Sequence, residues 1–222
     1  MLAHRGCGGY SRRGSVRALG VEKLTRKQAK QRTRLRLVEA VLDHVRHHGL
    51  TGLTTGKVAD QAGIAQSSFY VHFSDMDEAL QAAADKAGAE VRAIIRDARK
   101  SMDFSDPYRA FRSAYEGAIN ALLQERAFTE LLLSHRRDRS SPLAEALRHV
   151  LDDARADLAN DLKKAGFEAP FAEDIDVYAE LMVGMTLTVV EALLDERIHD
   201  ADRCLRALAS ITRELTASAR GR

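Results

Sequence analysis

Three short polar residues in a row could read the edges of DNA bases. They are Gln66, Ser67 and Ser68. A glutamine amide can donate to and accept from adenine at once, and a serine hydroxyl can contact a base or a phosphate. Nearby side chains carry hydrogen-bond donors that suit the phosphates of a DNA backbone. These are Lys57, Tyr70 and His72.

Short helices are expected to position these side chains. Helical apolar spacing predicts a first helix that begins at Thr25 and ends before Gly49, a residue that suits a helix end. Thr54 provides an N-cap hydroxyl for a second helix, which stops at Gly63, and residues 67–73 form a third. Two short helices joined by a glycine-containing turn and packed on a longer helix make a helix-turn-helix, whose second short helix enters the major groove.

The rest of the chain is also expected to be helical. Ser74 is a candidate N-cap for a long fourth helix that reaches about Lys100. Later breaks are expected at residues 103–107, 136–142, 166–170 and 198–200. Apolar residues recur at helical spacing between these breaks, and alternation at period two is absent, so we predict an all-α chain of about nine helices. The expected parts are a disordered basic tail (1–21), a helix-turn-helix DNA-binding domain (22–75) and a helical effector-binding and dimerisation domain (76–222).

Positive charge is concentrated near the beginning of the chain. Residues 1–36 hold eleven Lys or Arg and one acid, Glu22, which is +10, so the remaining residues carry −8 of the net +2. Cations displace the counterions condensed on nucleic acid, which favours a phosphate-bearing partner at this end. Beyond the tail, the candidates for DNA contact are Lys23, Arg26, Lys27, Lys30, Arg32, Arg34 and Arg36.

The string LTTGKVADQAGI at 53–64, followed by SFYVHF at 68–73, resembles the amino-terminal domain of TetR-family transcriptional regulators. The resemblance is specific over about residues 30–80. It implies that Lys57 and either Thr54 or Thr55 touch the DNA backbone. It also implies that Gln66, Ser67 and Ser68 lie at the bases and that Tyr70 and His72 anchor phosphates.

Two positions depart from the family pattern. Ala65 stands where a capping serine is common, and Met76 stands where a lysine often binds phosphate. The missing cap corresponds to about 1 kcal/mol. The segments 63–65, 68–70, 72–73 and 75–78, and the pattern of Phe128 with three leucines, look like a TetR subgroup that represses unsaturated fatty acid synthesis and senses acyl thioesters.

The resemblance also implies a homodimer on a palindromic DNA operator, with the last two helices of each protomer forming a four-helix interface. Apolar stripes on these helices suit that role, although the same stripes could pack only within the protomer. The candidate interface residues are Met185, Val189, Leu193, Leu205, Leu208 and Ile211.

A second set of apolar and aromatic residues could line a cavity between helices, where small molecules usually bind in bundles. Its members are Ile95, Phe104, Tyr108, Phe111, Tyr115, Leu132, Leu133 and Met182. Ordinary core packing is the competing explanation for each of them. A lining of this kind suits a lipophilic effector such as an acyl thioester, which would act by repositioning the fourth helix.

An enzyme is the main competing class. A di-metal carboxylate bundle needs two Glu-x-x-His motifs, and Glu196 with His199 gives one. His44, His47 and His48 are expected to be surface residues at a helix end. Phosphate-binding and hydrolase motifs are absent from the sequence, so we expect no catalysis, no metal and no cofactor.

Two further classes of protein would use the basic residues differently. An architectural or RNA-binding protein would bind nucleic acid without reading sequence, and a regulator without a ligand would act through protein contacts. Cys7 and Cys204 form no metal or disulfide framework. A secretory signal and a membrane span are not expected, which favours a cytoplasmic protein.

Overall fold

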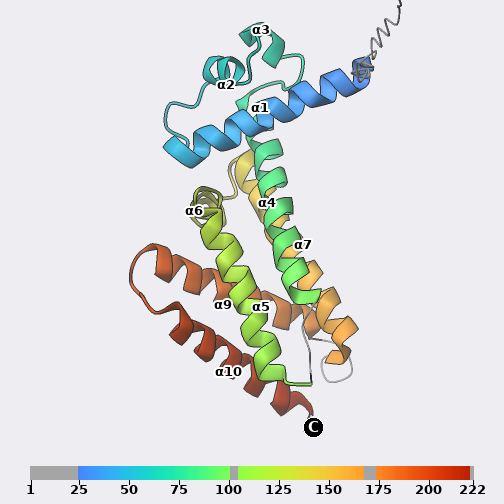
Figure 1. Cartoon of the computed structure of the whole chain (residues 1–222), viewed down its shortest axis with the longest axis vertical. Coiled ribbons are helices and arrows are strands. Elements are labelled where there is room, and N and C mark those ends of the chain that lie inside the picture. Colours follow the sequence, from blue (N-terminus) through green and yellow to red (C-terminus); the bar gives the residue numbers. More distant parts are fainter. Residues whose placement is uncertain (1–24, 101–104, 168–173, 221–222) are drawn as a thin grey trace, which may run out of the picture.

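The protein is all-α. The computed structural model describes residues 25–100, 105–167 and 174–220. The predicted basic tail 1–21, Lys23 and Phe104 lie outside these ranges. Within them the chain forms nine α-helices, one π-helical segment and no strand, which confirms the predicted fold class. The elements, labelled as in Figure 1, are α1 (Arg26–His48), α2 (Thr55–Gln61), α3 (Gln66–Phe69), α4 (Met76–Lys100), α5 (Pro107–Gln124), α6 (Arg126–His135), α7 (Pro142–Leu162), η1 (Lys163–Phe167), α9 (Ile175–Leu194) and α10 (Ala201–Arg220).

The first three helices pack into a small unit around aromatic side chains. Phe69 and Phe73 are at most 1% exposed and lie against Leu37 of α1 and Val58 of α2 in one apolar core. Gly63 adopts φ +65° in the turn between α2 and α3, a conformation that costs glycine little. The helix-turn-helix predicted from local signals is therefore present.

Several helix ends differ from the expectations. α3 is shorter than predicted, because residues 70–73 close in turns; the His72 and Phe73 N–H groups both donate to the Phe69 carbonyl. Asp75, and not Ser74, caps α4 by accepting from the Glu78 N–H at 2.9 Å, while the Ser74 N–H donates to the Glu78 carboxylate. At the start of α3, Ala65 provides no side-chain cap, as the sequence suggested.

A bend that the sequence did not predict separates α5 from α6. Glu125 leaves the helical region with φ −96° and ψ 50°. The Thr129 hydroxyl donates to the carbonyl of Leu122 at 2.6 Å, and this buried hydrogen bond satisfies a carbonyl that the end of α5 leaves without a helical partner. Arg46 of α1 pairs with Glu125 at 3.2 Å, so the bend lies directly against the helix-turn-helix unit.

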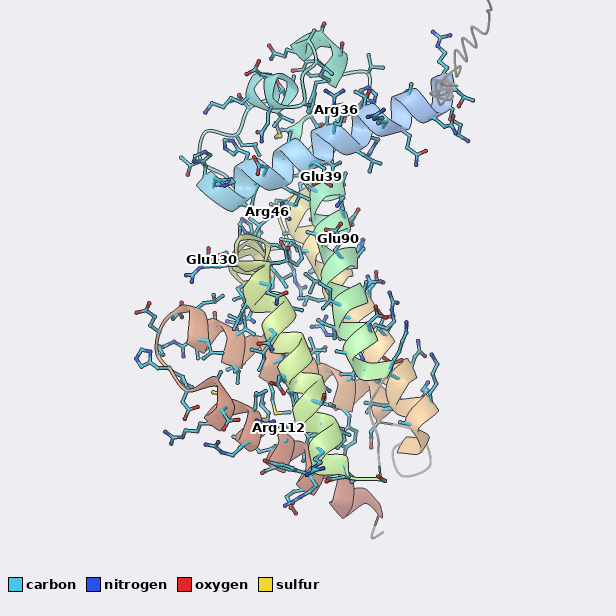
Figure 2. The ribbon with its side chains drawn as sticks, viewed as in Figure 1. Arg36, Glu39, Arg46, Glu90, Arg112 and Glu130 are labelled. Carbon is cyan, nitrogen blue, oxygen red and sulfur yellow. The ribbon has the colours of Figure 1, made fainter. Side chains whose placement is uncertain are left out.

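The long helix α4 joins the helix-turn-helix unit to the rest of the bundle. It begins beside α1 and runs alongside α7, as Figure 1 shows. Glu39 and Arg46, labelled on α1 in Figure 2, pair with Lys86 of α4 and with Glu125. A Cβ added at Gly88 would lie 2.5 Å from Val150, so α4 and α7 approach too closely there for a larger residue.

Helix α9 is long and apolar enough to cross a membrane, with a mean hydropathy of 1.6, so the sequence alone does not exclude a span. The fold uses this apolar character within the bundle. Ala179, Met182 and Val190 are buried, and α9 packs against α5, α7 and α10. Val177 and Leu181 lie about half exposed on another face of the same helix. Helix α9 is therefore a bundle helix with one face on the core and one apolar face exposed.

Candidate functional site

Three of the predicted DNA-contact residues meet at the junction of α2 and α3. The Gln66 amide donates from Nε2 to the Thr55 hydroxyl at 3.0 Å, and the Tyr70 hydroxyl lies 3.5 Å from the same Thr55 oxygen. Gln66 is exposed, and Tyr70 is 56% exposed. Thr55, Gln66 and Tyr70, here called the Thr55 cluster, thus form a polar surface whose side chains orient one another. The Gln66 oxygen remains available as an acceptor.

The remaining polar residues of α2 and α3 lie around this cluster. Ser67 is exposed and Ser68 is half-buried on α3. The Thr54 hydroxyl accepts from the Lys57 N–H at 3.3 Å and caps α2. The Lys57 ammonium donates to the Gly52 carbonyl at 2.9 Å, so it is held over the loop before α2 and outside the Thr55 cluster.

His72 follows α3 and faces cations of α1. Its ring is half-buried, and its Nδ1 atom has no hydrogen-bond partner among the described residues. Burial lowers the pKa of His72 below its ordinary value, and the positive charges of Lys30 and Arg34 lower it further. The imidazole is therefore neutral at pH 7. A phosphate placed here would meet Lys30 and a ring nitrogen that can take up a proton.

Two cations that were predicted to contact DNA are engaged inside the protein. The Arg34 guanidinium lies 4.2 Å from the centre of the Phe73 ring and pairs with Glu78 at 3.3 Å. Arg36 donates to the carbonyl of Ala62 at the end of α2. These contacts join segments far apart in the sequence, so charge patterning alone could not have revealed them. Arg34 remains 41% exposed, so a DNA contact from it stays a prediction.

A cavity of about 90 Å³ lies between α4, α5, α6, α7 and α9. Four residues of the predicted pocket line it: Ile95, Tyr115, Leu132 and Met182. Three others lie elsewhere. Phe111 is fully buried in the core, Leu133 is half-buried outside the lining, and Tyr108 lies under the Arg213 guanidinium at 5.8 Å.

Charged residues that the sequence pattern did not predict form one wall of this cavity. Arg92 and Arg99 of α4 line it together with Asp157 of α7. Arg92 pairs with Asp157 at 3.2 Å, and Arg99 pairs with Asp161 at 2.7 Å. Arginines and aspartates spaced three and four residues apart on the two helices were the signal that could have suggested this pairing. Since the charges neutralise each other, the cavity offers mainly apolar surface.

Tyr115 and Phe128 are the aromatic residues of the cavity lining, and Tyr115 also carries a hydroxyl group. Its hydroxyl lies 2.7 Å from the Thr212 hydroxyl, a buried contact between α5 and α10. Burial raises the pKa of Tyr115 to about 12, although the hydrogen bond to Thr212 acts in the opposite direction. The phenol is therefore neutral in the physiological range. Its hydroxyl is already satisfied within the fold.

The predicted interface residues divide between the core and the surface. Leu205 and Leu208 are 6% and 5% exposed and pack within the protomer, which is the arrangement that periodicity could not distinguish from an interface. Met185, Val189 and Leu193 are half-buried, and Ile211 is 48% exposed. An exposed apolar face on α9 and α10, here called the α9–α10 face, consists of Val177, Leu181, Ile211 and Leu215.

The candidates for a metal or catalytic centre do not assemble. His44 is buried, contrary to the expectation of a surface residue, and its Nε2 lies 3.1 Å from the Thr51 carbonyl. The described residues contain no group of three potential metal ligands. Glu196 and His199 are exposed after α9. Cys204 is a buried free thiol, and Cys7 lies outside the described ranges.

A known protein family matches the segment that carries the Thr55 cluster. Residues 38–83 match the family described as bacterial regulatory proteins, tetR family. An uncharacterized HTH-type transcriptional regulator from Haemophilus influenzae is 43% identical over 75 residues. That alignment covers 33% of this chain and 37% of the Haemophilus protein, so the chain spans little more than a third of its relative.

Solved structures match most of the chain. A TetR-like transcriptional regulator from Rhodococcus sp. RHA1 superposes with a TM-score of 0.59 at 17% identity, over 88% of this chain and 99% of the other. The fatty acid degradation regulator from Bacillus halodurans gives 0.61 at 16% identity, over 83% and 94%. The regulator RolR in complex with resorcinol gives 0.57 at 22% identity, over 88% and 95%. At these identities the likeness establishes a shared fold.

Proposed function

Because the chain belongs to the TetR family of bacterial regulatory proteins, we propose that it is a transcriptional repressor. It binds a palindromic operator as a homodimer, and a small lipophilic effector releases it. The observation that carries this proposal is the Thr55 cluster, which presents an oriented glutamine at the first turn of α3. Relatives of this kind are transcriptional regulators, in agreement with the expectation that the chain is not an enzyme.

The Thr55 cluster explains how the protein would read DNA. Thr55 holds one N–H of Gln66, which leaves the amide oxygen and a second N–H for the two edge positions of an adenine. Ser67 would reach the neighbouring base. Tyr70, His72 and Thr54 would position the helix by contacting phosphates, which carry no sequence information themselves.

The α9–α10 face supports the dimer. Isolated exposed apolar residues are common, but here α9 and α10, which contact each other, expose two large apolar side chains each, and exposed apolar surface of this kind supports an interface. Around Gly184, on the same helix, a Cβ would meet nothing within 4 Å. A second protomer packed about a twofold axis would cover this face. The dimer would then position one copy of α3 at each of two operator half-sites.

The size of the cavity constrains the effector. A cavity of about 150 Å³ accommodates benzene, and sites for larger ligands commonly measure about 300–1,000 Å³. The cavity here is about 90 Å³, so even a compact aromatic molecule must push its walls apart. One structural neighbour is a complex with resorcinol, and another is a regulator of fatty acid degradation. They suggest two classes of effector to test, which are small phenols and acyl thioesters.

Expansion of the cavity would change the position of the DNA-binding unit. Arg92 and Arg99 join α4 to α7 beside the cavity, and the other end of α4 carries Glu78 against Arg34. An effector that separates α4 from α7 would therefore tilt the helix that supports the DNA-binding unit. It can weaken DNA binding only by as much as it prefers the expanded conformation.

Selection from a random duplex library tests the function. We expect the full chain to enrich an inverted repeat at near-physiological salt. Gln66→Ala should change the preferred base at one position in each half-site, whereas Tyr70→Ala should weaken binding to all duplexes about equally. Binding without an enriched motif would favour an architectural protein and would remove the assignment of Gln66 and Ser67 to base reading.

A further inference from the structure

The amino-terminal end of α1 extends beyond the helix-turn-helix unit. Figure 1 shows it running past α2 and α3. Residues 26–32 are all exposed, so no tertiary packing holds these turns. A capping box holds them instead: the Thr25 hydroxyl accepts from the Gln28 N–H at 3.2 Å, and the Gln28 side chain accepts from the Thr25 N–H at 2.8 Å. The chain thus maintains about 10 Å of helix that its own core does not use.

These turns carry unbalanced positive charge. Residues 26–36 contain six Lys or Arg and no acid. Arg34 and Arg36 have partners within the fold. The side chains of Arg26, Lys27, Lys30 and Arg32 make no ion pair or hydrogen bond with any described residue. Four cations on a rigid, solvent-exposed helix repel one another, and a polyanion would relieve that repulsion.

One face of α1 directs this charge toward the DNA-binding surface. Lys27, Lys30 and Arg34 follow one another at intervals of three and four residues, so they share a face of the helix. This face points toward the segment that follows α3, because Arg34 lies over the ring of Phe73, the neighbour of His72, at 4.2 Å. Arg32 lies two residues from Lys30, about 200° around the helix axis, on the opposite side.

We infer that Lys27 and Lys30 bind DNA phosphates beyond the segment that α3 reads, and so lengthen the protein's contact with its operator. The inference rests on the proposed function. Consecutive cations on this face rise by about 4.5–6 Å along α1, and each can displace a condensed counterion from the duplex. These contacts add affinity and salt dependence and leave base preference unchanged.

Two single variants with the same charge change test the inference. Lys30→Gln on α1 and Arg109→Gln on α5 each remove one cation from an exposed helix position, and glutamine is a good helix former, so neither should disturb folding. Binding would be measured on the inverted repeat enriched by the wild-type chain, across a series of salt concentrations. Hydroxyl-radical footprinting on a longer duplex would locate the protected stretch of the sugar–phosphate backbone.

We expect Lys30→Gln to reduce the slope of log K against log salt by about 0.9 per protomer and to weaken binding on the order of tenfold. Its footprint should shorten at both outer ends, and Arg109→Gln should keep the wild-type slope and footprint. An equal slope change in both variants, or a wild-type slope and footprint in Lys30→Gln, would overturn the inference. Failure of the proposed function would appear earlier, as the absence of any enriched repeat for the wild-type chain.

Discussion

Arg34 on α1 and Glu78 in the first turn of α4 form an ion pair of 3.3 Å that joins the DNA-binding unit to the helix lining the cavity. The same guanidinium stacks on Phe73 at 4.2 Å. The backbone N–H of Ser74, which donates to Glu78, contributes most to lowering the pKa of this carboxyl group. One carboxylate thus holds the helix cap and the α1 contact together.

The ion pair predicts that Glu78→Gln tightens DNA binding. The substitution removes a negative charge close to the DNA-binding surface and frees Arg34, while a glutamine oxygen can still accept from the Ser74 N–H. We expect affinity for the operator to rise several-fold. The free energy of unfolding should fall by less than about 1 kcal/mol, because the pair is partly exposed. Fluorescence anisotropy and urea denaturation measure the two effects.

A matched control is Glu90→Gln, which removes the same charge from an exposed position further along α4. It should leave DNA affinity close to that of the wild type. Weaker operator binding by Glu78→Gln would mean that Arg34 needs its carboxylate partner to be held in place for DNA.

His72 predicts a pH dependence of operator binding. Its pKa is lowered in the free protein by burial and by Lys30 and Arg34, and a nearby phosphate would raise it. The complex would then bind a proton more readily than the free protein does. Affinity should therefore increase as pH falls through the pKa of the complex and should level off below the pKa of the free protein.

Titration calorimetry in buffers of different ionisation enthalpy would measure this proton uptake, and His72→Gln should abolish it. The effect of pH on folding stability has the opposite sign to its effect on operator binding. Because the folded pKa lies below the ordinary value of 6.5, the unfolded chain binds the proton more readily, and His72 lowers the free energy of unfolding as pH falls below about 6.5. Proton uptake of wild-type size in His72→Gln would assign it to another group.

Tyr115 and Thr212 predict a non-additive effect on stability. Tyr115→Phe leaves the Thr212 hydroxyl buried without its partner, and Thr212→Val does the same to the phenol. Each single variant should lower the free energy of unfolding by about 1–3 kcal/mol. The double variant should lose much less than the sum, since it leaves neither hydroxyl unsatisfied.

Urea denaturation of the wild type, the two single variants and the double variant would measure these losses as a double-mutant cycle. Additive losses would show that the two hydroxyls do not depend on each other. The pH dependence provides a second check: with a folded pKa of about 12 against 10 for the free phenol, the stabilisation is complete below pH 10 and is lost as pH rises toward 12.

The α9–α10 face predicts that Leu181→Glu yields a monomer. Leu181 is 48% exposed in the protomer, so the substitution should not disturb the core, whereas a carboxylate buried between two protomers would be costly. Sedimentation equilibrium should show the wild-type chain as a dimer and the variant as a monomer. Operator affinity should fall sharply in the variant.

Ile94→Glu is the matched control, because Ile94 on α4 is exposed to the same degree, 47%. It should remain a dimer. Dissociation by both variants, or by neither, would move the interface away from the α9–α10 face.

The sequence by itself determined the features that depend on neighbouring residues. Helical periodicity, the Thr54 cap and the positive φ of Gly63 are local, so the all-α class and the helix-turn-helix could be predicted from them. The three members of the Thr55 cluster were named from a motif in which they are at most fifteen residues apart, although their mutual hydrogen bonds were not predicted.

Only the tertiary structure decided which face of each helix meets another helix. An apolar stripe looks the same in the sequence whether it lines a cavity, fills the core or faces a partner. Packing therefore placed Tyr115 in the cavity wall, Phe111 in the core and Ile211 at the surface. It also paired Arg34 with a carboxylate 44 residues away, because a contact of this range depends on how α1 crosses α4 and not on any local pattern.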